Sequence, residues 1–259
     1  MDWQIAVDHM RENARRDLPW LTPSRPHSAQ LICVSGGPSL RDRPMAVENR
    51  QKRGGIVVAM NGAAKFLRSH RIEPNVIAFM DASEAVCGFI EETPENTEYL
   101  VSSQCHPKVF EMLKGRKIVL WHGFLPAPWL SQQTAILEAY RDKPSALIGG
   151  GLTIGLKMLN LGFIMGFRTF HVYGLDSSCA ADGADHAYVK HDGPEPSFID
   201  IEFDGSRYRC APWMAEQAHQ FKNITYPMLR QQNCRIHVHG DGLIPHIAEK
   251  LHSLERRAA

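Results

Sequence analysis

Short apolar runs rich in β-branched residues recur along the chain and are separated by segments with helical spacing of apolar positions. Most of the runs are continuously apolar, a pattern typical of parallel strands that are covered on both faces. Strands that alternate with helices indicate βαβ units. The pattern therefore predicts an α/β fold of the Rossmann-like, doubly wound kind, with a mainly parallel sheet of about seven strands. The predicted strands are 30–35, 55–61, 75–81, 98–103, 117–122, 169–176 and 235–240.

Residues 177–211 interrupt this alternation. The first half of the segment is polar, and the second half alternates apolar and polar residues around Asp204-Gly205, a dipeptide that favours a tight hairpin turn. We predict a polar loop and a β-hairpin that together form a lid over the ligand-binding edge of the sheet. An insertion without a function is the alternative. Residues 1–29 are predicted as an N-terminal helical extension, and 30–259 as a single domain that carries this lid.

The composition narrows the choice of partners and compartment. Lys plus Arg number 29 and Asp plus Glu 28, so the near-neutral chain offers no bulk attraction for nucleic acid or anionic membranes. The six cysteines form no C-x-x-C pair, as expected of reduced thiols. The start of the sequence lacks the apolar core of a secretory signal, and the longest apolar stretch, 152–167, contains Lys157 and Asn160. We therefore predict a soluble cytoplasmic protein.

Small or hydrogen-bonding residues follow every predicted strand. In open α/β sheets, ligands bind beyond the carboxyl ends of the strands, so we expect these residues to meet at one edge and line a site. Turn formation alone would explain any one of them. The segments are 35–39 (SGGPS), 61–62 (NG), Asp81, 102–104 (SSQ), 122–123 (HG), 174–176 (GLD) and 240–242 (GDG).

Two glycine-rich segments are candidates for binding phosphate. In the loop 35–40, glycines permit close approach of the backbone, and exposed N–H groups can hold phosphate oxygens. This loop matches neither the G-x-G-x-x-G fingerprint nor a Walker A motif, and a plain turn is the alternative. The second segment, Gly149-Gly150-Gly151, precedes Thr153 and a predicted helix over 153–167, whose N-terminus suits an anion. We predict a phosphate-bearing nucleotide ligand.

The candidate acid–base groups cluster after the strand that ends at Asp176. Carboxylates near a bound phosphate are suited to Mg²⁺, and an imidazole titrates near neutrality, as a general base must. Of the two lid histidines, His186 is preferred to His191 because it follows Asp185 and lies closer to Asp176. A solvated polar loop is the alternative. The sequence contains no G-x-S-x-G or H-E-x-x-H signature, which disfavours hydrolase and zinc-enzyme classes.

These segments resemble, in order, motifs of a known family. ICVSGGPSL resembles the opening GPSL motif of the MptE-like 6-hydroxymethylpterin diphosphokinases, and more distantly of bacterial sialyltransferases and flagellin-modifying Maf glycosyltransferases. VVAMNGAAKFL with IEPNVIAFMDAS, and GGGLTIGLKMLNLGFIMGFRTFHVYGLDSS, resemble the later strand ends and the glycine-helix-Gly-Asp block. FDGSRYRC and GDGLIPHI also have counterparts in the bacterial members. The resemblance spans roughly residues 30–245.

The resemblance implies a Rossmann-like fold that binds a nucleotide donor at the GPSL loop and at the later glycine-rich helix start. Archaeal members transfer diphosphate from ATP to a pterin with Mg²⁺, sialyltransferases move a sugar from a CMP donor without a metal, and Maf proteins act on nonulosonic acid sugars. The catalytic histidine of the sialyltransferases falls near 208–210, where this chain has none. By position, the residues that would line the donor site are Gly36, Gly37, Pro38, Ser39, Asn61, Asp81, Gly150, Thr153 and Asp176.

The sequence therefore predicts a cytoplasmic nucleotide-binding transferase that uses ATP or a nucleotide sugar and moves a diphosphate group to a small acceptor. A glycosyltransferase and a non-catalytic nucleotide-binding module are the alternatives. His186 and Asp176 are the predicted catalytic residues, and Asp81 and Asp176 the predicted ligands of Mg²⁺. The oligomeric state stays open. The predicted donor-binding residues are Ser35, Gly36, Gly37, Pro38, Ser39, Asn61, Gly150, Gly151 and Thr153.

Overall fold

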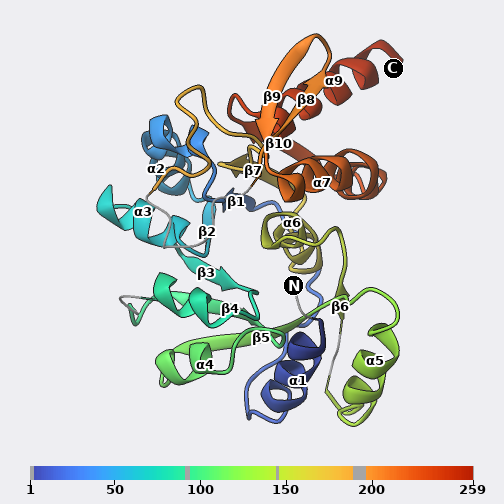
Figure 1. Ribbon diagram of the computed structural model, residues 1–259. Coiled ribbons are helices and arrows are strands. Elements are labelled where there is room, and N and C mark those ends of the chain that lie inside the picture. Colours follow the sequence, from blue (N-terminus) through green and yellow to red (C-terminus); the bar gives the residue numbers. More distant parts are fainter. Residues whose placement is uncertain (1–2, 91–93, 144–145, 189–196, 259) are drawn as a thin grey trace.

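The computed structural model describes residues 3–90, 94–143, 146–188 and 197–258. In this part of the chain, eight strands form one sheet in the order β10-β7-β1-β2-β3-β4-β5-β6, and all neighbours run parallel (Figure 1). This confirms the predicted parallel α/β sheet. The strands are β1 Gln30–Val34, β2 Ile56–Met60, β3 Val76–Phe79, β4 Glu98–Ser102, β5 Lys117–Gly123, β6 Leu147–Ile148, β7 Thr169–Tyr173 and β10 Arg235–His239.

Among the described strands of this sheet, β6 is the one that the hydrophobic pattern did not predict. It consists of two residues, Leu147 and Ile148, which pair with His122 and Gly123 at the end of β5. Two residues are too few to show a strand-like run, and their pairing depends on where β5 ends in space. The sheet therefore has one strand more than the sequence predicted.

The strand order reverses beside β1. From β1 the chain adds strands in one direction as far as β6, and then β7 returns to the other side of β1. At such a switch point the connections leave β1 and β7 on opposite sides, which opens a crevice at their carboxyl ends. The fold thus places a crevice beside the loop that follows β1, the position at which open α/β sheets generally bind ligands.

Helices cover both faces of the sheet. Successive residues of β1 alternate between two buried clusters, with Leu31 and Cys33 in one and Ile32 and Val34 in the other. Continuous apolar strands are explained by this double coverage. The helices are α1 Trp3–Asn13, α2 Pro44–Lys52, α3 Ala63–Ser69, α4 Lys108–Met112, α5 Leu130–Glu138, α6 Ile154–Ile164, α7 Pro212–Gln220, α8 Tyr226–Gln231 and α9 Leu243–Ala258, with a π-helical turn at Phe221–Thr225 and 3₁₀ turns at Pro38–Asp42 and Glu84–Phe89. None of these helices is long and apolar enough to cross a membrane.

The N-terminal helix α1 packs into the domain. Its residues Val7 and Met10 are fully buried in the core, and it lies against α5 (Figure 1). The Asn13 side chain donates hydrogen bonds to the carbonyls of Ser103 and Cys105. The helix therefore covers the carboxyl ends of β4 and β5, so these strand ends are not open to a ligand.

The predicted hairpin is confirmed. β8 (Ile199–Phe203) pairs antiparallel with β9 (Ser206–Cys210). Asp204 and Gly205 have φ angles of 49° and 78°, the left-handed values that a type I′ turn requires at both central residues. Pro212 opens α7 as expected, since a proline is favoured at the first position of a helix.

Candidate functional site

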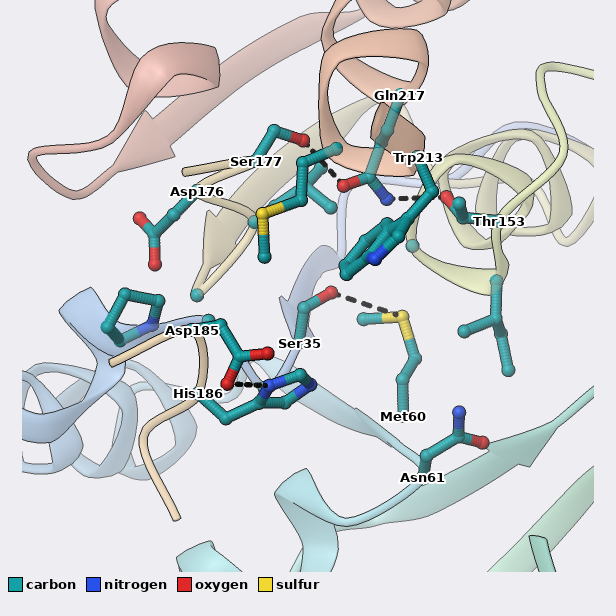
Figure 2. Close-up of a pocket in the computed structure, with 18 of the residues that line it drawn as sticks. Ser35, Met60, Asn61, Thr153, Asp176, Ser177, Asp185, His186, Trp213 and Gln217 are labelled. Carbon is teal, nitrogen blue, oxygen red and sulfur yellow. Dashed lines mark hydrogen bonds and ion pairs between the residues drawn. The ribbon is translucent and has the colours of Figure 1, made fainter. Parts of the chain in front are cut away.

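A cavity of about 390 Å³ opens at the carboxyl ends of β1, β2, β3 and β7 (Figure 2). Residues of the loop after β1, the start of α6, the segment after β7 and the start of α7 enclose it. Its polar lining includes Ser35, Asn61, Asp81, Thr153, Asp176, Ser177, Ser178, Asp185, His186, Tyr188 and Gln217. Its apolar lining includes Met60, Met80, Leu152, Ile154, Trp213 and Met214.

Most of the residues predicted from the sequence lie together in this cavity. Three predicted donor-binding residues do not line it. Ser39 lines an adjoining cleft instead, and the Gly150 carbonyl accepts a hydrogen bond from the Thr225 hydroxyl. Gly151 lies against Leu156 and Gln220, at the foot of α6. The predicted residues that line the cavity are Ser35, Gly36, Gly37, Pro38, Asn61, Asp81, Thr153, Asp176 and His186.

The loop after β1 uses its N–H groups differently from the expectation. The Gly37 N–H donates to the Gly174 carbonyl at 2.7 Å, and the Ser39 N–H donates to Asp176 Oδ2 at 2.9 Å. A Cβ atom at Gly37 would lie 2.5 Å from the Gly174 carbonyl oxygen, so glycine is needed there for packing against the end of β7. These two donors are committed within the protein, and a phosphate must find others.

Asp176 lies beneath that loop. It is 2% exposed, and burial raises the pKa of its carboxyl, an effect opposed by the hydrogen bonds from Ser39. Figure 2 shows the carboxylate pointing away from Met60 and Asn61 on the far side of the cavity. The hydrogen bond from the Ser39 N–H to Asp176 therefore holds the loop after β1 in place. The predicted action of Asp176 on substrate and metal stays a prediction.

His186 pairs with the residue before it. Its Nδ1 lies 2.9 Å from Asp185 Oδ1, and the two side chains are 21% and 19% exposed (Figure 2). A carboxylate at Nδ1 fixes the ring orientation and leaves Nε2 available for proton transfer. The arrangement is compatible with a general base, and the catalytic role of His186 stays a prediction. The alternative, His191, lies outside the described residues.

The segment 180–188, which carries this pair, is docked on the loop after β1. Arg41 donates to Asp182 Oδ2 at 2.6 Å and to the His186 carbonyl at 2.9 Å, and the Ala187 N–H donates to the Gly36 carbonyl at 2.9 Å. The Tyr188 ring covers Gly36 and Gly62, and burial raises the pKa of its hydroxyl to about 12. Sequence reasoning missed Tyr188, because no local pattern marks which ring will lie over two distant glycines.

The N-terminus of α6 is the clearest position for an anion. Thr153 Oγ1 accepts from the Leu156 N–H and from Gln217 Nε2, while Ile154 and Gly155 line the cavity. The first N–H groups of a helix lack partners within the helix and carry the positive end of its dipole. A phosphate in the cavity would meet favourable electrostatics there.

Carboxylates are the main charged groups of the lining. Asp81, Asp176 and Asp185 line the cavity, and its described lining contains neither Lys nor Arg. Asp81 is exposed, and its Oδ1 accepts from the Ser83 N–H at 3.0 Å. No group of three or more His, Cys, Asp or Glu in the described ranges is arranged to hold a metal ion. Mg²⁺ commonly takes only one or two carboxylates from the protein and completes its coordination shell with water and phosphate oxygens. Asp81 therefore fits the role of a single protein carboxylate for an Mg²⁺ that is bound to the phosphates of a nucleotide.

Not all strand ends reach the cavity, contrary to the expectation of a single common edge. At β4 and β5, His122 Nδ1 lies 2.9 Å from Ser103 Oγ, and the Gln104 and Gln133 amides donate to the Gly123 carbonyl. This network is buried under α1 and α5 and stabilises the fold. At β10, a Cβ on Gly242 would lie 2.6 Å from Asp176 Cβ, so this turn packs behind the site.

The model of a family described as 6-hydroxymethylpterin diphosphokinase MptE-like matches residues 6–182. Among solved structures, a Maf glycosyltransferase from Magnetospirillum magneticum AMB-1 is similar with a TM-score of 0.67 and 14% identity, over 98% of this chain and 41% of that chain. The chain thus spans about two fifths of that protein, and the likeness establishes the fold alone.

A mammalian sialyltransferase, in complex with Gal-beta-1-3GalNAc-ortho-nitrophenol, matches with a TM-score of 0.42 and 9% identity, over 92% of this chain and 86% of that chain. A score this low supports no inference. No curated protein sequence matches the chain significantly.

Proposed function

Because the chain belongs to the 6-hydroxymethylpterin diphosphokinase MptE-like family, we propose that it is a transferase that binds a nucleoside-phosphate donor in the strand-end cavity. The family match carries the proposal, since it includes the ends of β1, β2, β3 and β7 and the start of α6, which form the cavity floor. The helix N-terminus offers a place for the phosphates, and the Asp185–His186 pair offers a base.

The reaction proposed first is the transfer of diphosphate from ATP to a hydroxyl of a small acceptor, in the cytoplasm. His186 removes the proton of the acceptor hydroxyl, and the oxygen bonds to the β-phosphorus of ATP. The bond from that phosphorus to the oxygen of the α-phosphate breaks, and AMP leaves with the electron pair. Asp185, whose Oδ1 lies 2.9 Å from His186 Nδ1, holds the imidazole in orientation.

The acidic lining favours a metal-dependent version of this reaction. A triphosphate placed near Asp81 and Asp185, without a Lys or Arg in the described lining, experiences repulsion unless a cation accompanies it. Asp81 would hold Mg²⁺ jointly with the phosphates, whereas Asp176, the other predicted ligand, follows β7, three strands away from β3 in the sheet. Bound at Asp81, the ion would neutralise phosphate charge that develops during transfer.

Glycosyl transfer from a nucleotide sugar is the second candidate. The observation that favours it is the likeness of the fold to a Maf glycosyltransferase, with a TM-score of 0.67 over 98% of this chain. The same base would then activate the acceptor hydroxyl toward a sugar carbon. A module that binds nucleotide without turnover is the alternative from another functional class.

Ligand-dependent thermal stabilisation tests the donor site. CMP, UDP, GDP and ATP are added with and without Mg²⁺, and a ligand at a hundred times its Kd should stabilise the fold by about 2.7 kcal/mol. We expect ATP with Mg²⁺ to give the largest shift. Turnover is then measured as AMP release with 6-hydroxymethylpterin as acceptor. Stabilisation by CMP alone, independent of metal, would support glycosyl transfer, and binding without turnover of any donor would support the non-catalytic module.

A further inference from the structure

Trp213 is a large apolar side chain at the cavity that the proposed chemistry leaves unused. It lines the cavity and is 45% exposed, and Leu152, which also lines the cavity, is 43% exposed. Apolar surface left in water is a free-energy cost that a covering ligand removes. Two such side chains at the same cavity indicate a place where a ligand presents an apolar face.

The helix α7 fixes the position of Trp213. One turn further along, Gln217 Nε2 donates to Thr153 Oγ1, and Gln217 Oε1 accepts from the Ser177 hydroxyl at 2.6 Å. Gln220 Oε1 accepts from the Leu152 N–H at 2.8 Å. Residues four apart lie on the same face of a helix, so these bonds turn Trp213 toward the cavity. Figure 2 shows the indole between Thr153 and Met60.

The indole lines the cavity together with other apolar groups. Met60, Met80 and Ile154 line the same space, and Met60 and Met80 are buried. Thioether and aromatic groups make favourable contacts with flat rings. Ile154 also belongs to the first turn of α6, where an anion is favoured, so the apolar side and the anion position adjoin. A flat ring joined to a phosphate chain matches both.

We infer that Trp213 stacks on the heteroaromatic base of the donor nucleotide, with the phosphates directed to the start of α6. This inference rests on the proposed function and adds a residue that selects the ligand. The family match ends at residue 182, so Trp213 lies outside the segment that defines the family in this chain. Recognition of the base is thus assigned to α7, and recognition of the phosphates to the family-matched floor.

Binding measurements on three variants test the inference. Trp213→Ala removes the ring and Trp213→Phe keeps a smaller one, while Ile224→Ala, which truncates another exposed side chain of the same helical region, is the control. Calorimetry is run with ATP and CMP, with base-free ribose 5-phosphate and inorganic diphosphate, and with 6-hydroxymethylpterin. Melting temperatures establish that each variant is folded.

We expect Trp213→Ala to weaken binding of the tighter nucleotide by about 5-fold to 150-fold, the range for loss of one stacked base, and Trp213→Phe to restore most of the affinity. Base-free ligands should bind as in the wild type. Equal loss for base-free ligands, or a loss confined to the pterin, would overturn the inference. If Trp213→Ala binds nucleotide as the wild type does, the stacking inference is wrong and the proposed function stands. If the wild type itself binds no nucleotide, both the inference and the proposed function are wrong.

Discussion

At the scale of single residues, some groups of the site hold the backbone in place, and others have side chains at the cavity surface. Asp176 and Gly37 hold the loop after β1 to the end of β7 through the Ser39 and Gly37 N–H groups. The His186 side chain contacts Asp185 and the Tyr188 ring, and the Asp81 side chain accepts from the Ser83 N–H, one or two positions away along the chain in each case. Both side chains line the cavity. Substitutions at His186 and Asp81 therefore test chemistry with the least disturbance of the fold.

Replacement of the proposed base is the first such test. His186→Ala should lower kcat by about 10²–10⁴-fold with nearly unchanged donor affinity, because a general base acts on the proton of the acceptor. Steady-state kinetics and calorimetry measure the two effects. His70→Ala, a change at an exposed histidine at the end of α3, is the matched control. A His186→Ala enzyme with wild-type kcat would remove the residue from the mechanism.

Asp81 tests the metal. Asp81→Asn keeps the shape of the side chain and removes its charge, so the Mg²⁺-dependent gain in ATP affinity should fall at least about 10-fold, the scale seen when metal sites lose a supporting group. Affinity in EDTA should stay the same. Titration of ATP with and without Mg²⁺ measures both. If wild-type binding is indifferent to Mg²⁺ and EDTA, diphosphate transfer loses its main support and glycosyl transfer gains.

At the scale of elements, polar contacts hold the segment 180–188 over the loop after β1. Arg41 makes two of these contacts, and the partly buried ring of Tyr188 packs against the core. The sequence predicted a polar loop here, and the structure shows that specific contacts hold these residues of it. The restraint is tertiary, because Arg41 lies 141 positions before Asp182.

Loss of Arg41 should release this segment. Arg41→Ala removes one ion pair and one hydrogen bond to a carbonyl, worth about 0.7–2 kcal/mol together, so cleavage before Asp182 or Asp185 by an Asp-specific protease should accelerate about 3- to 30-fold. Arg53→Ala, at the exposed end of α2, is the control. Equal cleavage rates in Arg41→Ala and wild type would show that Arg41 does not restrain the segment.

The two glycines of the loop should behave differently. A Cβ atom at Gly36 would meet the Tyr188 hydroxyl, the end of a side chain that can move, whereas at Gly37 it would meet the backbone of Gly174. Gly37→Ala should therefore lower the melting temperature by several degrees, since about 1 kcal/mol or more of strain enters the core of the fold. Gly36→Ala should lower it less and perturb Tyr188. Calorimetric melting curves compare them, and equal losses would contradict the assigned contacts.

At the scale of the whole molecule, buried neutral histidines link stability to pH. Burial lowers the pKa of His122 to about 4, and burial with the nearby Arg50 lowers that of His171 to about 3. His171 stacks on His237, and its Nδ1 lies 3.1 Å from His239 Nε2. These rings favour the neutral form in the folded chain, while the unfolded chain takes up protons near pH 6.5.

Stability should therefore be complete above about pH 6.5 and fall as the pH is lowered toward 4, by up to about 1.4 kcal/mol per pH unit for each such ring. Urea unfolding between pH 8 and pH 4.5 measures the slope. His122→Gln, which cannot take up a proton, should flatten it. A free energy of unfolding that is constant over this interval would contradict the neutral, buried state of these rings.

The sequence by itself determined most elements of this protein and the edge of the sheet at which the cavity lies. Continuous apolar runs specified the buried strands, Asp204-Gly205 specified the hairpin, and residues at the ends of β1, β2, β3 and β7 predicted the cavity floor. These are local properties, set by periodicity, backbone conformation and the common polarity of parallel strands.

Only the tertiary structure decided which strand ends remain open and what encloses them. His122 ends a strand and Gln104 follows one, much as Asp81 does, yet α1 and α5 bury them, because helix packing depends on the whole sheet. Tyr188 and Trp213 reach the cavity from segments far along the chain, a proximity that no local pattern records. The sequence thus determined at which edge of the sheet the site lies. Long-range packing determined which residues enclose it and which apolar groups line it.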